Sequence, residues 1–447
     1  MKIAVLSASP KQQFSLTLQT VRALEKMFPQ DEFDVHFIKK GIDHSEFETK
    51  ANEADLVLVL SSLYHFNVHG QLIAYLEGIH IREGKPITYL TTSGGNMDVP
   101  AHNFMRSFAR GNRLSWIKSL SLLDEDILQE SGREELYRWF LYVKDMVLNT
   151  TLPDTALKDR SVILLDCTET EDETKDMLVT LRADYEALGA KVKTISLREK
   201  TIKGCIACFG CYTNNKCVIK DDFEELTQEL YDNTDMIITV APVVYNQFGK
   251  LYKYFLDRHV KFGRFSQDHE IYRAYVCIGE TDGLNYAELE QHTYVVDSLD
   301  SDYFVGLFQT GEEALKDMVR QSALSCMHEL FPQRNTYYYG LNLQFANLAY
   351  RLQNMTKKDY EYFKAKGYYE MPQIIPQVGP ISGLEDGRMS AQMRLIAFEE
   401  MLSKLDGPPK LTKRGERSQF RHMIGALPSE PAADKTAKKG FGLFKKK

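Results

Sequence analysis

Short apolar runs alternate with longer amphipathic segments along the first part of the chain. The apolar runs predict strands at 2–7, 33–38, 55–62, 86–92 and 114–123. Segments with apolar residues at helical spacing predict helices near 15–27, 69–83, 99–111 and 133–147. The strand runs are continuously apolar rather than alternating, which is typical of parallel strands that are covered on both faces. The pattern therefore predicts an α/β fold with a doubly wound parallel sheet.

The same pattern restarts after a polar linker at 148–160. Strands are predicted at 161–167, 191–197, 235–242, 272–279 and 302–308, with helices near 173–189, 222–232, 248–260, 284–297 and 311–329. Segments 54–77 and 234–257 share an Asp, an apolar strand, a Tyr, a Gly and a helix that ends in an acidic residue, 180 residues apart. This similarity predicts two copies of one α/β unit. Two unrelated α/β domains remain the alternative.

The pattern changes beyond residue 330. Residues 331–406 are rich in Tyr and mostly helical in period, and we expect them to pack on the second domain. Residues from 407 onward are rich in Pro, Gly, Lys and Arg, which predicts a flexible tail. The predicted organisation is a domain at 1–150, a domain at 161–330, an extension at 331–406 and a basic tail at 407–447.

Composition narrows the class of protein. The 447 residues are 43% hydrophobic and 26% charged, which excludes a disordered, collagen-like or disulfide-scaffold chain. No apolar run approaches the roughly 20 residues of a membrane-spanning helix. The opening MKIAVLS is too short for the apolar part of a secretion signal, so we expect a cytoplasmic protein.

Charge is distributed unevenly along the chain. The tail carries 11 Lys and Arg against three acidic residues, so the net charge of -7 combines a tail of +8 with a body of -15. An acidic body disfavours nucleic-acid binding, which depends on neutralising phosphates. The last residues, KKGFGLFKKK, suit peripheral contact with an anionic membrane surface. A tail that only improves solubility is the alternative.

Three loops of the first domain are candidates for ligand binding, because ligands of open parallel sheets bind beyond the carboxyl ends of the strands. The first loop, 7–17, is rich in hydroxyl groups and opens a helix, which suits a phosphate. The second, 61–70, offers flat aromatic surfaces and an amide. The third, 91–98, contains a Gly pair that lets the backbone approach a ring closely. The candidate residues are Ser9, Lys11, Ser15, Thr17, Leu63, Tyr64, Phe66, Asn67, Ser93, Gly94 and Gly95.

Over about residues 1–147 these loops resemble those of flavodoxin-like NAD(P)H-dependent flavin and quinone reductases. In that family an SPR or SPK loop holds the phosphate of FMN, and loops of the P-x-Y-N-F and GG types flank the flavin ring. The resemblance implies FMN and NAD(P)H as cofactors. This chain departs from the pattern by having Ser62 for Pro, His65 for Asn and a shorter phosphate loop. Alternatively, Ser9 and Ser15 cap a helix and Tyr64 packs in the core.

The second domain differs in its first loop and in its cysteines. Loop 167–176 carries four acidic residues at 169–173, where they would repel a phosphate. Segments 203–223 and 241–258 resemble the NADPH-dependent FMN reductase group and its iron–sulfur flavoprotein branch. A C-x2-C-x2-C-x5-C run supplies thiols at this spacing for a [4Fe–4S] cluster. Zinc, or free or redox-active thiols, remain alternatives. The candidate ligands are Cys205, Cys208, Cys211 and Cys217.

Together these features predict two tandem flavodoxin-like domains that form an internal pseudo-dimer, with higher oligomers left open. The predicted activity is FMN-dependent transfer of electrons from NAD(P)H to a quinone, a flavin or a protein acceptor, with a [4Fe–4S] cluster as a candidate relay. An electron carrier without NAD(P)H turnover is one alternative. A non-enzymatic scaffold whose sites have decayed is the other.

Overall fold

The computed structural model describes 1–38, 44–93, 98–123, 126–172, 174–208, 210–211, 216–263, 271–279, 288–290, 292–293, 303–331, 346–353, 356–365, 369 and 391–413. Gly94 and Gly95, most of the predicted helix at 284–297 and the tail beyond 413 lie outside these residues. Within the described part, no helix combines the length and the apolar character that crossing a bilayer requires.

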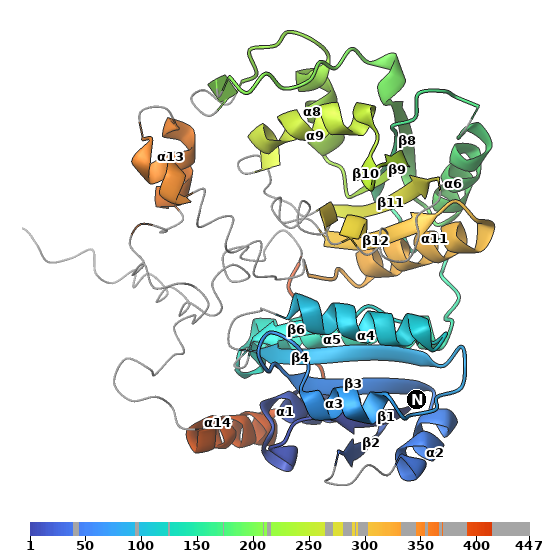
Figure 1. Ribbon diagram of the computed structural model, residues 1–447, viewed down its shortest axis with the longest axis vertical. Coiled ribbons are helices and arrows are strands. Elements are labelled where there is room, and N and C mark those ends of the chain that lie inside the picture. Colours follow the sequence, from blue (N-terminus) through green and yellow to red (C-terminus); the bar gives the residue numbers. More distant parts are fainter. Residues whose placement is uncertain are drawn as a thin grey trace, which may run out of the picture.

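The first domain is a parallel sheet with helices on both faces (Figure 1). The strand order is β2-β1-β3-β4-β5, and β6 pairs with β4. This 2-1-3-4-5 order is the flavodoxin-like one, as predicted. The strands are β1 (Lys2–Ser7), β2 (Glu32–Phe37), β3 (Leu56–Ser62), β4 (Pro86–Ser93), β5 (Ser115–Trp116) and β6 (Leu120–Leu123). The helices are η1 (Gln12–Phe14), α1 (Leu16–Met27), α2 (Ser45–Glu53), α3 (Gly70–Leu76), α4 (Val99–Gly111), η2 (Asp126–Leu128) and α5 (Glu130–Val147).

The second domain repeats this topology. Its strand order is β12-β11-β9-β7-β8, which is again 2-1-3-4-5 when it is read from the β8 edge, and β10 pairs antiparallel with β9. The strands are β7 (Ser161–Asp166), β8 (Lys191–Ser196), β9 (Met236–Val244), β10 (Gln247–Phe248), β11 (Tyr272–Ile278) and β12 (Tyr303–Gln309). The helices are α6 (Lys175–Ala187), η3 (Leu197–Glu199), α8 (Phe223–Tyr231), α9 (Lys250–Gly263) and α11 (Glu312–Met327).

The two domains share details beyond strand order. The strands β3 and β9 begin 180 residues apart, and each ends in a two-residue turn whose central residues both have positive φ. These residues are His65 and Phe66 in the first domain, and Tyr245 and Asn246 in the second. Two successive positive φ values define a type I′ turn, which matches the twist of the strands that it joins. The turn therefore occupies equivalent places in the two sheets.

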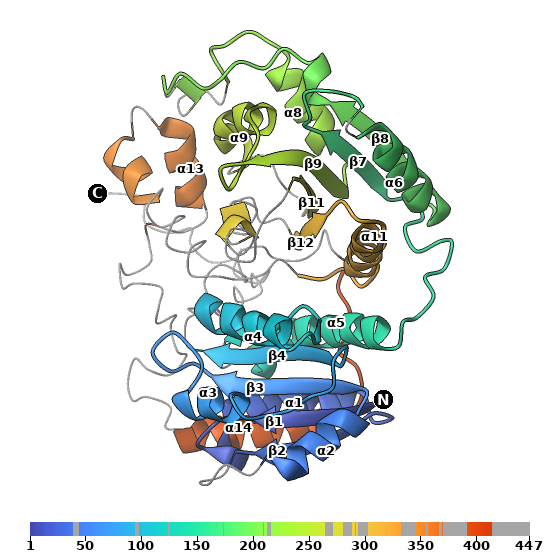
Figure 2. The same ribbon diagram turned by 45° about the vertical axis from the view of Figure 1, so that its right-hand side comes forward.

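Both domains contribute to one core. Helices α4 and α5 lie between the first sheet and the α11 side of the second domain in both views (Figures 1 and 2). Apolar residues such as Tyr142 on α5 and Met318 on α11 belong to the same buried cluster. Because removing apolar surface from water is the main favourable term in folding, this shared core holds the domains together.

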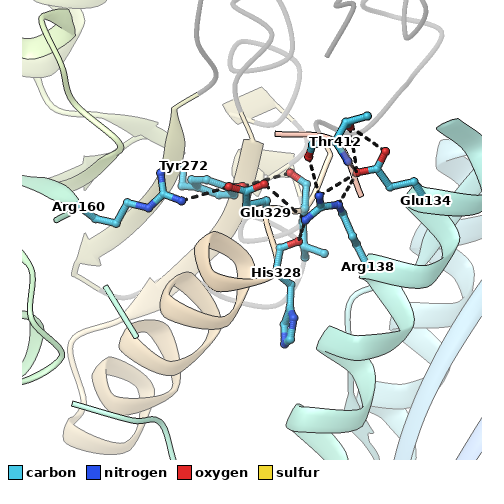
Figure 3. A network of polar contacts seen from close by, with 8 residues as sticks. Glu134, Arg138, Arg160, Tyr272, His328, Glu329 and Thr412 are labelled. Carbon is cyan, nitrogen blue, oxygen red and sulfur yellow. Dashed lines mark hydrogen bonds and ion pairs between the residues drawn. The ribbon is translucent and has the colours of Figure 1, made fainter. Parts of the chain in front are cut away.

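Polar contacts also cross the boundary between the domains (Figure 3). Arg138 on α5 pairs with Glu134 at 2.8 Å and donates to the His328 carbonyl at 3.0 Å beyond α11. Arg160 pairs with Glu329 at 3.2 Å and with Asp235 at 3.0 Å. The Glu134 and Arg138 side chains are almost fully buried, so their charges depend on each other for stabilisation.

The C-terminal extension corrects one expectation. It contains α13 (Lys357–Ala365) and α14 (Ala391–Lys404). We expected it to pack on the second domain, but α14 packs against α1 of the first (Figure 2). Phe398 anchors α14 because its ring is fully buried in the shared core. The sequence indicated a mostly helical extension but contained no signal for which domain would cover each helix.

The predicted tail also begins with an attached segment. The backbone N–H of Thr412 donates to Glu134 at 2.9 Å, and its hydroxyl donates to both oxygens of the same carboxylate. Arg138 donates to the Thr412 carbonyl at 2.8 Å. The polar network between the domains therefore holds residues that composition alone had assigned to a flexible tail.

Candidate functional site

Hydroxyl groups join the three loops that the sequence singled out in the first domain. The Thr17 hydroxyl, in the first turn of α1, bonds to Ser62 at 3.1 Å and to Thr92 at 2.8 Å. These partners lie at the ends of β3 and β4, so the start of α1 is fixed to two neighbouring strands. Thr17 is buried and has these bonds within the protein, which gives it a positioning role.

The first and second loops meet directly. The Ser9 side chain accepts the Lys11 N–H at 3.3 Å and hydrogen bonds with the Tyr64 hydroxyl. Burial raises the pKa of Tyr64, and its bond to Ser9 works against that rise. Lys11 is exposed. The loops after β1 and β3 therefore form one continuous edge, with a lysine at its margin.

Two buried hydroxyls in the first loop have no hydrogen-bond partner in the described part of the chain. They belong to Ser7, at the end of β1, and to Ser15, at the N-terminus of α1. Ser15 makes no capping bond to its helix, although serine is among the commonest capping residues. A buried hydroxyl without a partner costs free energy. A ligand with anionic oxygens would satisfy both the hydroxyls and the N-terminus of α1.

The second loop is the type I′ turn from Tyr64 to Asn67. Its ends are joined by two backbone bonds, of 2.9 and 3.1 Å. Leu63 lies half-buried before the turn, and the Phe66 side chain is 50% exposed at its tip. Asn67 uses its side-chain oxygen to accept the Val68 N–H at 2.8 Å. The turn thus presents aromatic surface beside the first loop, as the sequence predicted.

Beside the third loop is a buried polar cluster that sequence reasoning missed. Ser93 is buried at the end of β4, and Asp98 begins α4 after the Gly pair. Asp98 accepts bonds from Thr91 and Ser121, both at 2.5 Å, and pairs with His102 at 3.2 Å. Burial works to raise the pKa of Asp98, but the charge of His102 and these hydrogen bonds outweigh it and lower the pKa.

This cluster predicts a pH effect. The pKa of an Asp in an unfolded chain is about 3.9. Below roughly pH 4 the unfolded chain therefore binds a proton at this carboxylate, whereas Asp98 in the folded protein stays ionised to a lower pH. The stabilisation from Asp98 is therefore present above that pH and is lost as pH falls through the lower folded pKa. We expect Asp98→Asn to reduce the free energy of unfolding at pH 7 and to flatten its decline between about pH 4 and 2. Denaturant unfolding at several pH values measures both effects, and parallel curves would contradict the assignment.

The equivalent loop of the second domain is closed by its own side chains. The N–H of Ala8 bonds to Leu60 after β1, and the N–H of Cys167 bonds to Val240 after β7, which aligns the two loops. In this alignment Ser7 corresponds to Asp166. Ser15, which precedes α1, corresponds to Thr174, which precedes α6.

Asp166 is fully buried, and its partners come from three segments. It accepts bonds from Thr168 at 2.6 Å, Ser196 at 3.2 Å and Thr174 at 3.4 Å, and it forms an ion pair with Arg198. The Thr174 hydroxyl is thus hydrogen bonded to Asp166, whereas the Ser15 hydroxyl at the equivalent position has no partner among the described residues. The sequence predicted that the loop would repel phosphate because of residues 169–173, whereas the buried carboxylate is Asp166.

The four cysteines of the motif lie in one exposed segment. Cys205 and Cys208 are exposed, while Cys211 and Cys217 are half-buried. Partial burial raises the pKa of the Cys211 thiol, and the other three thiols add to the rise, so the four lie near one another. Even so, among the described residues, no three His, Cys, Asp or Glu side chains converge as metal ligands.

A buried arginine closes the base of the cysteine segment. Arg258 on α9 pairs with Asp221 at 2.6 Å, donates to the Lys203 carbonyl at 3.2 Å and donates to the Cys217 sulfur at 3.2 Å. Burial works to lower the pKa of Arg258, but its bonds to Asp221 and Cys217 raise it overall. Arg258 thus joins both ends of the segment to α9, a contact that its sequence position did not indicate.

Comparison with known proteins gives relatives of one class. No family model matches the chain. An iron–sulfur flavoprotein of Archaeoglobus fulgidus is 24% identical over 204 residues, which cover 43% of this chain and 91% of that protein. An iron–sulfur flavoprotein of Clostridioides difficile is 30% identical over 87 residues, 19% of this chain and 39% of that protein. A solved NADPH-quinone reductase from P. pentosaceus aligns with a TM-score of 0.28 at 13% identity, over 34% of this chain and all of that one.

Proposed function

Because this chain is similar to iron–sulfur flavoproteins and carries two tandem α/β domains of flavodoxin-like strand order, we propose that it is an FMN-dependent oxidoreductase. In this proposal it takes electrons from NAD(P)H and passes them to a quinone, a flavin or a protein acceptor. The observation that supports it most is the pair of buried, unpartnered hydroxyls of Ser7 and Ser15 in the loop after β1. In sheets of this order FMN binds at the switch point between β1 and β3, which is where these hydroxyls lie.

Different residues of the first domain would bind the phosphate and the ring of FMN. Ser15, Ser9 and the N-terminus of α1 would bind the phosphate, with Lys11 adding positive charge at the margin. The turn that carries Tyr64 and Phe66 would cover the ring. Thr17 and Asp98 hold the loops in place through the bonds described above. Bound FMN supplies the hydride and electron chemistry, and the protein supplies position and electrostatics.

The proposal assigns one FMN to each chain. In the second domain, the Asp166 carboxylate already accepts the bonds of the loop hydroxyls and of Arg198. A phosphate there would meet a buried negative charge and would find its donors occupied. The second domain would thus serve as a pseudo-dimer partner and as the carrier of the cysteine segment. A [4Fe–4S] cluster is one candidate for that segment, and no electron step is assigned to it, because no three of the described side chains converge as metal ligands.

Visible absorption of protein purified without oxygen, with flavin and iron quantified on the same sample, tests the proposal. We expect flavin bands, about one FMN per chain, and bleaching on addition of NADH or NADPH. If FMN were bound but neither NADH nor NADPH reduced it, the protein would be an electron carrier without NAD(P)H turnover. A colourless protein that takes up no added FMN would overturn the proposal and would support a non-enzymatic scaffold. About four iron atoms per chain would support a [4Fe–4S] cluster bound by the cysteine segment.

A further inference from the structure

A histidine lies beside the turn that covers the proposed flavin site. His69 precedes α3, and its Nδ1 accepts the backbone N–H of Gln71 at 3.1 Å. An imidazole nitrogen that accepts a hydrogen bond carries no proton, so the single N–H of this neutral ring is on Nε2. Among the described residues, Nε2 has no hydrogen-bond partner. The bond to Gln71 therefore leaves one N–H donor available on a half-exposed ring.

The ring of His69 is connected to the first loop. Its centroid lies 4.5 Å from that of Tyr64, edge to face, and Tyr64 in turn bonds to Ser9. This chain of contacts fixes the imidazole within one side chain of the residues that are proposed to bind phosphate. Packing against Tyr64 and the bond to Gln71 restrict the ring from two sides, so the donor is positioned before any ligand arrives.

The two domains differ at this position. The strands β3 and β9 begin 180 residues apart, and the position equivalent to 69 is Gly249. A side chain at Gly249 would collide with Pro242, since an added Cβ would lie 2.8 Å from the Pro242 ring. The imidazole thus occurs in the domain whose first loop has unpartnered hydroxyls, and it is absent from the domain whose loop Asp166 closes.

We propose that His69 is a positioning residue whose Nε2–H donates a hydrogen bond to the ring system of the bound flavin. This inference rests on the proposed function. Reduction adds negative charge to a flavin ring, and a fixed donor stabilises the form with more charge. His69 therefore favours the reduced state over the oxidised state and raises the midpoint potential of the bound flavin.

Two matched variants separate this role from helix capping. His69→Asn keeps a strong capping residue before α3 but removes the imidazole N–H. His80→Asn makes the same substitution at a histidine outside the three loops, where the side chain is 90% exposed. The midpoint potential of bound FMN, the affinity for oxidised FMN and the free energy of unfolding are measured for both variants.

We expect His69→Asn to weaken the binding of reduced FMN by about tenfold relative to oxidised FMN, which lowers the midpoint potential by about 30 mV. The free energy of unfolding should stay within about 0.5 kcal/mol of the parent value. His80→Asn should leave the potential unchanged. Equal potentials in the parent protein and in His69→Asn would overturn the inference while leaving the proposed function intact. Failure of the parent protein to bind FMN would overturn both.

Discussion

Replacing Ser15 by alanine should weaken FMN binding by roughly ten- to a hundredfold without destabilising the protein that lacks FMN. The Ser15 hydroxyl is buried and has no partner among the described residues, so its removal breaks none of the bonds described above. Removing an unsatisfied buried hydroxyl is neutral or slightly stabilising. A hydrogen bond to a charged phosphate, by contrast, contributes about 1.5–3 kcal/mol, and each 1.4 kcal/mol is a factor of ten in affinity. Titration of FMN into the apoprotein and denaturant unfolding measure the two effects.

The second domain supplies the control, because Thr174 occupies the position equivalent to Ser15. Its hydroxyl bonds to the Asp166 carboxylate, so Thr174→Ala should reduce the free energy of unfolding by about 1 kcal/mol and leave FMN affinity unchanged. The pair should therefore show opposite results in the two assays. If Ser15→Ala retained full FMN affinity, or if Thr174→Ala lost it, the phosphate would not lie in the loop after β1.

The central strands were predictable because both of their faces are buried, whereas the edge strands β2 and β8 are only partly buried and contain polar residues. Burial on both faces makes a strand a continuous apolar run, and nine of the ten predicted runs correspond to single strands. The run at 114–123 instead forms β5 and β6, since polar residues 118 and 119 interrupt its pairing with β4. The helix α2 was missed because only Phe47 and Ala51 are buried on it, which is too few for a clear helical period.

The candidate site was predictable only as far as loop positions. Parallel strands fix which loops share an edge, so the meeting of the first and second loops followed from the strand pattern. Bonds between distant side chains did not follow from it. Asp166 ends β7 and Arg198 lies in η3, directly after β8, so the two become neighbours only because β7 and β8 pair in register. Likewise, the spacing of the cysteines gave their proximity, but not the bond from Arg258 to Cys217.

The interface between the domains combines a shared apolar core with the network around Arg138 (Figure 3). The sequence predicted an internal pseudo-dimer but not which residues form its interface, because contacts between α5 and α11 join residues far apart in the chain. Among the residues that the structure describes, Glu134 accepts bonds only from Arg138 and Thr412. Its buried carboxylate therefore depends on one guanidinium for charge compensation.

We expect Arg138→Ala to lower the free energy of unfolding by about 3–5 kcal/mol, because it leaves the Glu134 carboxylate buried without a cation. The loss should exceed that of Arg113→Ala, whose exposed pair with Glu83 contributes at most about 1 kcal/mol. A double variant, Glu134→Leu with Arg138→Met, removes both charges and should recover most of the lost stability. Denaturant unfolding of the four proteins measures these differences. If the double variant were as unstable as Arg138→Ala, the buried Glu134 charge would not be the cause of the lost stability. The packing of the arginine between α5 and the residues after α11 would then be what holds the two domains together.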